Sequence, residues 1–142
     1  MRVSLESIRR GDAGLDEHRA AMLRRVPAIG DWAKFSYEHL SMKDLAYLTA
    51  KTGHEFAILR GKHIDILFHG SERSCTFDEA LAGLLLSRQL KLYGHSHPGE
   101  VTPVASPEDR EVLQIIGQKT SRLIAALSGI EIRFSDDPFE VV

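Results

Sequence analysis

Two histidines stand on either side of a single residue in the segment YGHSHPGEVTPVASPEDREVL, which covers residues 93–113. In an extended strand, His95 and His97 project to the same face, because side chains alternate along a strand. Two imidazoles buried side by side leave ring nitrogens without partners, whereas the same pair is a natural chelate for a metal ion. The spacing indicates metal binding, although such pairs also occur on solvated strand ends.

A carboxylate follows the histidines at the start of an expected helix. Ser106 and Pro107 have the residue types of an N-cap and a first helical position, so Asp109 falls in the first turn. From there its side chain can point back toward the end of the strand. The sequence Ser-Pro-Glu-Asp is also a good helix start without any metal. The two interpretations are compatible, because a capped helix start fixes a carboxylate in space.

The only cysteine of the chain is Cys75. It excludes an internal disulfide and a zinc cage built from thiolates. Any metal must therefore be held by histidine and carboxylate side chains.

These residues resemble a known family. A glutamate, then H-[ST]-H-P, then S-x-x-D is the signature of the JAB/MPN (JAMM) metallopeptidases. The residues of this chain that resemble the pattern are Glu55, the segment His95-Ser96-His97-Pro98 and the segment Ser106-Pro107-Glu108-Asp109. The resemblance covers roughly residues 33 to 136 and includes the order of the expected helices and strands.

The resemblance implies a role for each residue. His95, His97 and Asp109 would hold Zn²⁺, with a water as the fourth ligand, which is the open arrangement of catalytic zinc sites. Glu55 would be the general base and acid, and the hydroxyl of Ser106 would stabilise the oxyanion. The implied activity is hydrolysis of peptide or isopeptide bonds, and the implied partner is a peptide or protein substrate. Conjugates of ubiquitin-like or sulfur-carrier proteins belong to this substrate class.

Three alternatives stand beside this hypothesis. Glu100 lies in the loop after the histidines and is a rival to Glu55 as the base, although the family pattern has no counterpart for it. The string GHSHP also resembles a metal motif of calcineurin-like phosphoesterases, but the chain lacks the G-N-H motif which that family needs. A non-catalytic JAB/MPN-like domain, which binds metal or another protein, is the third; the presence of every ligand favours the enzyme.

The elements that must position these residues follow from local patterns. We expect strands at 32–37, 55–59, 64–68, 90–93, 123–127 and 130–134, with a tight hairpin at 60–62. Helices are expected at about 42–51, after a Ser41/Asp44 capping box, at about 80–86, after a Thr76/Glu79 capping box, and from 106 to about 119. Mixed strands, helices and hairpins predict an α/β (α+β) sandwich, with a mixed β-sheet flanked by helices. The resemblance implies the JAB1/MPN-like (cytidine-deaminase-like) form of it.

Residues 1–31 differ in character from the rest. A loose apolar face and several arginines predict a helical lead-in that Pro27 ends. The resemblance implies that residues 32–142 form a JAB/MPN-like metalloprotease domain.

Composition limits the partners and the compartment. The 142 residues are 43% hydrophobic and 27% charged, with a formal net charge of −2, which does not supply the basic field of a nucleic-acid-binding protein. No segment is long and apolar enough to predict a secretory signal or a membrane span. We therefore expect a cytoplasmic protein without a nucleic-acid or membrane partner.

Overall fold

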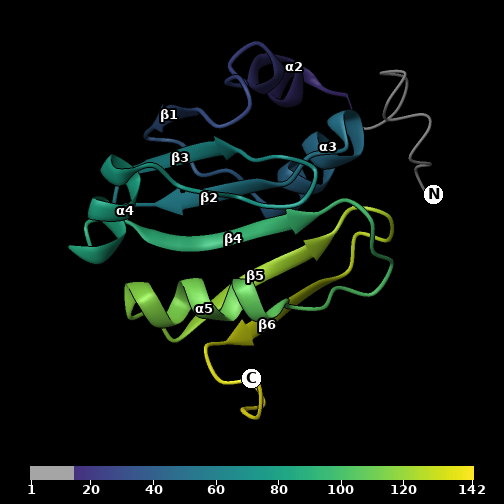
Figure 1. Cartoon of the computed structure of the whole chain (residues 1–142). Helices are drawn as coiled ribbons and strands as arrows, with labels where there is room; N and C mark the ends of the chain where they lie inside the picture. The colour runs from purple at the N-terminus through teal and green to yellow at the C-terminus, as the bar shows by residue number, and fades with distance from the viewer. Residues whose placement is uncertain (1–14) are drawn as a thin grey trace.

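Six strands form one sheet in the computed structural model, which describes residues 15–142 (Figure 1). The strands are β1 (Trp32–Ser36), β2 (Phe56–Arg60), β3 (Ile64–His69), β4 (Lys91–His97), β5 (Thr120–Ala125) and β6 (Glu131–Ser135). Their order across the sheet is β1-β3-β2-β4-β5-β6. β4 and β5 run parallel, and the other neighbouring pairs are antiparallel. The expected mixed sheet is confirmed.

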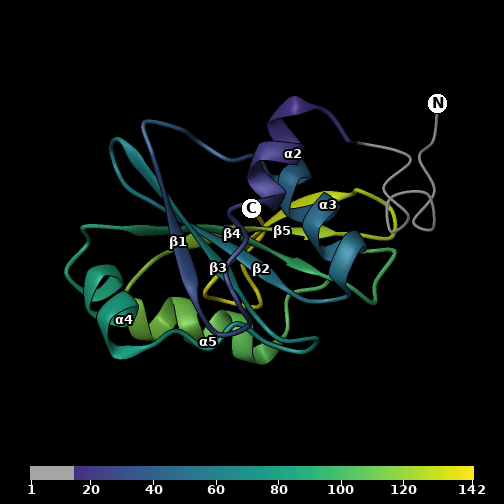
Figure 2. The same ribbon diagram turned by 90° about the horizontal axis from the view of Figure 1, so that it is seen from above.

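Helices cover both faces of this sheet and make a three-layered α/β fold (Figure 2). The helices are α2 (Glu17–Leu23), α3 (Met42–Thr52), α4 (Glu79–Leu86) and α5 (Pro107–Ile116). Along β2, Phe56 and Ile58 pack in the core beneath α2 and α3, while Ala57 and Leu59 pack in the core beneath α4 and α5. All four are fully buried, as expected of a central strand that is covered on both faces.

Short-range capping signals set the ends of the helices. The predicted capping box of α3 is confirmed, with Ser41 and Asp44 bonding each other's backbone, and the helix ends at Gly53 with a φ of 77°. The predicted box before α4 is wrong, because Asp78 is the N-cap and Thr76 lies outside the helix. The longest helix within residues 15–142 has 11 residues, and none of those described is long and apolar enough to cross a membrane.

Two strands, β4 and β5, differ from their predicted bounds by more than one residue at an end. β4 extends to His97 instead of ending at residue 93. β5 begins at Thr120 and ends at Ala125, so Leu127 falls in a turn that Gly129 closes by bonding its amide to the Ala125 carbonyl. The predicted ends followed the apolar residues, whereas the observed ends follow the pairing between strands.

The amino-terminal helix belongs to the core under α3. Met22 is buried there, with Leu23 and Val26 packed against the same cluster. The helix ends at Leu23, before the Pro27 that was expected to end it. The predicted lead-in at residues 1–31 lies partly outside the described residues, in its first fourteen positions.

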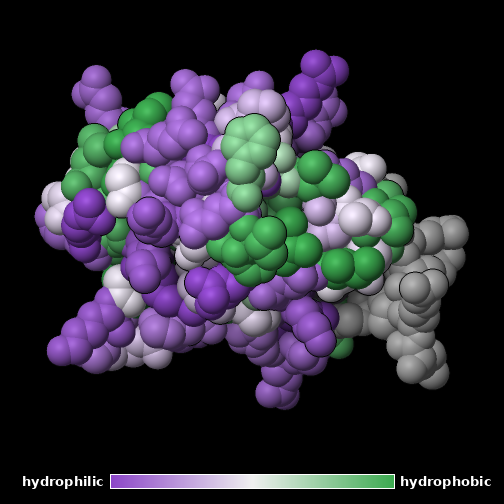
Figure 3. All heavy atoms as spheres, turned by 90° about the horizontal axis from the view of Figure 1, so that it is seen from below, coloured by the Kyte–Doolittle hydropathy of each residue, from purple (hydrophilic) through white to green (hydrophobic). Residues whose placement is uncertain are grey.

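From the side of β6 and the carboxyl end of the chain, polar side chains dominate and apolar ones gather near the middle (Figure 3). The most exposed apolar residues of the carboxyl-terminal tail are Phe139 and Val141.

Candidate metal centre

A one-residue irregularity in β4 decides where the histidines point. Leu59 pairs with Leu92, but Ile58, which precedes Leu59 in β2, pairs with Gly94. Tyr93 therefore has no partner in β2. This β-bulge shifts the alternation of β4 by one position. Leu92 and His95 therefore share the face under α5, although they are three positions apart.

The opposite face of β4 fits closely against α3. A side chain at Gly94 would overlap Met42, and the Ser96 hydroxyl lies 2.5 Å from the hydroxyl of Thr49. Ser96 also accepts a hydrogen bond from the Phe56 amide at 3.0 Å. These contacts hold Gly94 and Ser96, the two neighbours of His95, and keep both imidazoles on the side of α5.

The start of α5 brings a carboxylate to the histidines. Ser106 is the N-cap, and its hydroxyl accepts a hydrogen bond from the Asp109 amide at 3.1 Å. The Asp109 carboxylate accepts one from the Ser106 amide at 2.8 Å. The expected N-cap at Ser106 and the helix start are confirmed, and the reciprocal bonds form a capping box that aims Asp109 back toward β4.

Three side chains meet at the spacing of a tetrahedral metal site. Nε2 of His95 lies 3.2 Å from Nε2 of His97 and 3.0 Å from Oδ1 of Asp109. Nε2 of His97 lies 3.3 Å from Oδ2 of Asp109. Ligands about 2.0 Å from a tetrahedral zinc ion are separated by about 3.3 Å. The donor set of two imidazoles and a carboxylate fits such an ion.

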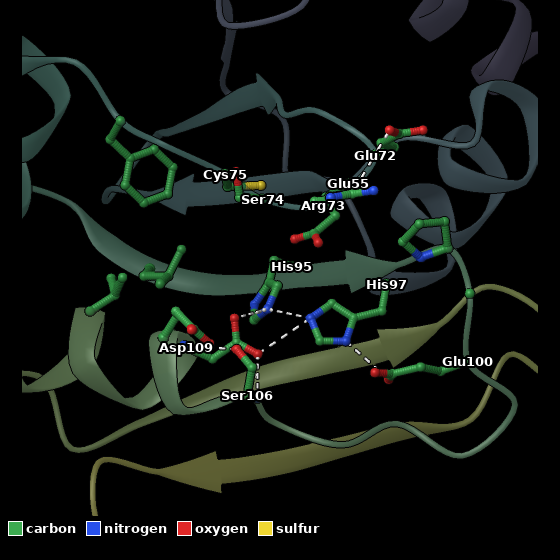
Figure 4. Close-up of a pocket in the computed structure, with 16 residues that line it drawn as sticks. Glu55, Glu72, Arg73, Ser74, Cys75, His95, His97, Glu100, Ser106 and Asp109 are labelled. Carbon is green, nitrogen blue, oxygen red and sulfur yellow. Dashed lines mark hydrogen bonds and ion pairs between the residues drawn. The ribbon is translucent and has the colours of Figure 1, made fainter.

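Glu55 faces the same point from the neighbouring strand. Ala57 pairs with His95 in an antiparallel register, and the same register carried back two residues sets Glu55 beside His97. The side chain is buried, and its carboxylate with the ring nitrogens of His95 and His97 forms a group within 4.8 Å that could hold a metal ion. Figure 4 shows the two histidines between Glu55 and the pair Asp109 and Ser106.

Glu100 holds the far side of one imidazole. Its carboxylate accepts a hydrogen bond from Nδ1 of His97 at 2.9 Å and another from the Val104 amide at 3.1 Å. With its proton on Nδ1, a neutral His97 directs the lone pair of Nε2 into the site. Nδ1 of His95, in contrast, is buried and has no hydrogen-bond partner within residues 15–142.

The electrostatics of the metal-free site favour a proton on His97. Burial alone would lower the pKa of His97, but hydrogen bonds with Asp109 and Glu100 outweigh it and raise the pKa to about 9. Burial likewise opposes the charge on Asp109, yet its bonds with the two histidines hold the pKa of that carboxyl far below its usual range. A metal ion must therefore displace a proton from His97.

Burial is the main cause of the pKa shifts of Glu55 and Cys75, which also line the pocket. Burial raises the pKa of Glu55, against the opposing effect of His95 and His97. Burial also raises the pKa of the Cys75 thiol, and the carboxylates of Glu55 and Asp109 add to the rise. Cys75 therefore remains a thiol near neutral pH and is a poor ligand in this state.

A cleft of about 580 Å³ opens onto the histidines. Its walls come from β4, from the loop between β3 and α4, from the loop after His97, and from the first turns of α5. It is lined by Glu55, Glu72, Arg73, Ser74, Cys75, Phe77, Leu92, His95, His97, Pro98, Gly99, Glu100, Ser106, Glu108, Asp109 and Val112. A substrate segment of a few residues can therefore reach the site.

The structure brings together all five residues singled out from the sequence, Glu55, His95, His97, Ser106 and Asp109. Glu100, considered as a rival base, instead contacts the outer nitrogen of His97. This contact could not be predicted from the sequence, because it depends on the path of the loop. Val112, which lines the same cleft, was also missed. Its position one helical turn after Asp109 predicts that it lies on the same face of α5 as Asp109.

Comparison with known proteins adds no family to these observations. No protein-family model matches the chain, and none of the curated proteins or solved structures is a significant match.

Proposed function

We propose that the protein is a zinc-dependent hydrolase of peptide or isopeptide bonds, of the JAMM type, with the corresponding JAB/MPN-like arrangement of its sheet and helices. The observation that carries the proposal is the meeting of His95, His97 and Asp109 at 3.0 to 3.3 Å, at the bottom of an open cleft. Two imidazoles and one carboxylate suit zinc, and three protein ligands leave one position for the reaction.

In this proposal zinc, when bound, polarises the scissile carbonyl and lowers the pKa of water to about 7. Glu55 takes the proton of the attacking water and passes it to the leaving amine. Its buried position and raised pKa suit a base that must accept a proton and release it again near neutral pH.

Ser106 supplies the oxyanion contact. Its hydroxyl oxygen accepts a hydrogen bond from the Asp109 amide. Within residues 15–142 the hydroxyl group donates its proton to no acceptor. The proton is therefore available to the oxygen of the substrate carbonyl, so that capping and catalysis use different parts of one hydroxyl.

The substrates we propose are peptide or isopeptide bonds in the cytoplasm, including conjugates of ubiquitin-like or sulfur-carrier proteins. The size of the cleft, which can take a short segment of chain, supports this class, together with the sequence resemblance.

Zinc content tests the metal centre. Wild-type protein purified without chelator should contain about one zinc per chain by elemental analysis, and His97→Ala should contain much less. A wild-type value near zero that added zinc does not raise would overturn the proposal. Full zinc in His97→Ala would move the site elsewhere.

Glu55→Gln distinguishes a role of Glu55 as the base from a role as a metal ligand, because the amide keeps the shape of the side chain. We expect zinc content to remain and peptide hydrolysis to fall about 10²- to 10⁴-fold. Glu72→Gln, which changes another carboxylate of the cleft wall, is the matched control and should keep its rate. Loss of zinc in Glu55→Gln would make Glu55 a ligand, and an unchanged rate would remove the proposed mechanism.

A further inference from the structure

One part of the cleft is apolar. Four of its lining residues, Cys75, Phe77, Leu92 and Val112, carry side chains without a charge or a strong hydrogen-bonding group. The charged lining residues outside the metal centre include Glu72, Arg73 and Glu100. The distribution of these two sets along the cleft follows from the topology of the sheet.

The apolar residues lie toward the start of β4. β4 and β5 are parallel and joined by α5, so α5 runs back along the sheet in the opposite direction to β4. Val112 therefore lies one helical turn from Asp109 toward the start of β4, as Leu92 does along the strand. Both extend the wall of the cleft away from the metal centre.

Three of the four charged lining residues outside the metal centre lie at the other end, and the fourth, Glu108, precedes Asp109 in the first turn of α5. β3 and β4 both pair antiparallel with β2, so both end at the same edge of the sheet. Glu72 and Arg73 follow the end of β3, and Glu100 follows the end of β4. The chain after Arg73 then returns past Cys75 and Phe77 to α4. The metal centre lies between a charged end and an apolar end (Figure 4).

The apolar end is both open and firmly held. Phe77 and Val112 are only partly buried and line the cleft, while both pack against the core beneath α4 and α5. Phe77 meets the ring of Phe68 edge-on, with the centroids 5.0 Å apart. A preformed apolar hollow beside a few polar groups is the usual form of a ligand subsite.

We propose that this apolar end is a specificity subsite, which accepts an aliphatic or aromatic side chain of the substrate next to the scissile bond. The inference rests on the proposed function, because it takes the metal centre as the point of cleavage. The preferred substrates are then peptide or isopeptide bonds flanked on one side by a residue such as leucine or phenylalanine, rather than by a charged residue.

Simple hydroxamates test the subsite apart from catalysis, because they bind a zinc ion without being cleaved. The probes are acetohydroxamate, which carries only a methyl group, and 3-methylbutano- and 4-methylpentanohydroxamate, which add branched chains of two lengths. The malonamide hydroxamate, in which a carboxamide replaces the isopropyl group of the shorter branched probe, controls for size. Their dissociation constants for the zinc-loaded protein are measured by calorimetry. At least one branched probe should bind ten times tighter, or more, than acetohydroxamate. The carboxamide probe should show no such gain.

Two substitutions locate the gain. Val112→Thr keeps the shape and adds a hydroxyl, and Val112→Phe fills the hollow. Each should reduce the advantage of the branched probes by about tenfold or more and leave acetohydroxamate binding and zinc content unchanged. Val101→Thr is the matched control, because Val101 is exposed in the loop after β4 and does not line the cleft. Thermal unfolding of each variant verifies that it is folded.

The outcomes separate the two proposals. If the zinc-loaded protein does not bind acetohydroxamate, the open metal centre is wrong, and the subsite falls with it. If acetohydroxamate binds but neither branched probe gains affinity, or the gain survives in both Val112 variants, the subsite is wrong and the metal centre stands.

Discussion

At the scale of single residues, Glu100 contacts His97, a candidate ligand, instead of the reacting atoms. We therefore assign Glu100 a positioning role. A carboxylate on the outer nitrogen of a ligating histidine fixes the tautomer that binds metal. Glu100→Ala should therefore lower zinc affinity about 10- to 100-fold in a competition titration, and Glu100→Gln, which can still accept the Nδ1 proton, should recover part of the loss.

Glu108→Ala is the control for this prediction, since it removes a carboxylate that lines the cleft and that belongs to the first turn of α5. It should leave zinc affinity close to that of the wild type. If Glu100→Ala lowers the melting temperature but not zinc affinity, Glu100 only anchors the loop through the Val104 amide.

The raised pKa of His97 predicts how zinc binding depends on pH. Below about pH 9 the metal-free imidazole is mostly protonated, and zinc must displace that proton. The apparent zinc affinity, corrected for the competing chelator, should therefore rise about tenfold per pH unit from pH 7 to 9 and then level off. An affinity that does not change over this range would contradict the proton on His97.

The same shift acts on folding of the metal-free protein with the opposite sign. The folded pKa of about 9 lies above the ordinary value of 6.5, so the stabilisation is complete below pH 6.5 and is lost as pH rises through 9. The melting temperature of metal-free protein should fall over this interval, and His97→Gln should remove this part of the fall.

At the scale of elements, the chain provides a matched pair of helix caps. Ser106 of α5 and Ser41 of α3 each form a capping box with an aspartate, but only Ser106 lines the cleft. Ser106→Ala and Ser41→Ala should each cost about 1 kcal/mol of unfolding free energy in urea titrations. Only Ser106→Ala should also reduce hydrolysis, by about 10²- to 10³-fold. Equal activity in the two variants would leave Ser106 as a cap alone.

Helix ends could be predicted from the sequence where a short-range interaction sets them. The capping box at Ser41 and the N-cap at Ser106 were predicted correctly because a cap involves residues three positions apart. The prediction of Thr76 as an N-cap was wrong because Asp78, two residues later, also suits that position, and the sequence pattern does not rank the two.

Strand ends depend on partners far along the chain, so the sequence predicted them less well. Leu127 is apolar and was assigned to a strand, yet it is 43% exposed in the turn before β6. The segment from Gly94 to His97 contains no apolar side chain, but it continues β4 because it pairs with β2 and β5. The grouping of His95, His97 and Asp109 was predictable, whereas the contact of Glu100 and the apolar end of the cleft depend on loop paths.

At the scale of the whole molecule, two apolar cores on either side of the sheet hold the fold without a metal. Leu113 and Ile116 anchor α5, the helix that carries Asp109, in the core beneath it. Removal of zinc with a chelator should therefore leave the far-UV circular dichroism nearly unchanged while abolishing hydrolysis. Global unfolding on chelation would instead show that the metal is a structural part of the fold.

The bulge at Tyr93 acts on the sheet as a frameshift acts on a reading frame. Every residue of β4 after it has exchanged faces relative to a regular strand, so the histidines meet α5 while Ser96 meets α3. A regular strand of the same sequence, with Tyr93 paired, would keep all the proposed ligands and yet turn His95 and His97 toward α3. The unpaired residue at position 93 is thus as much a part of the site as the identity of its ligands.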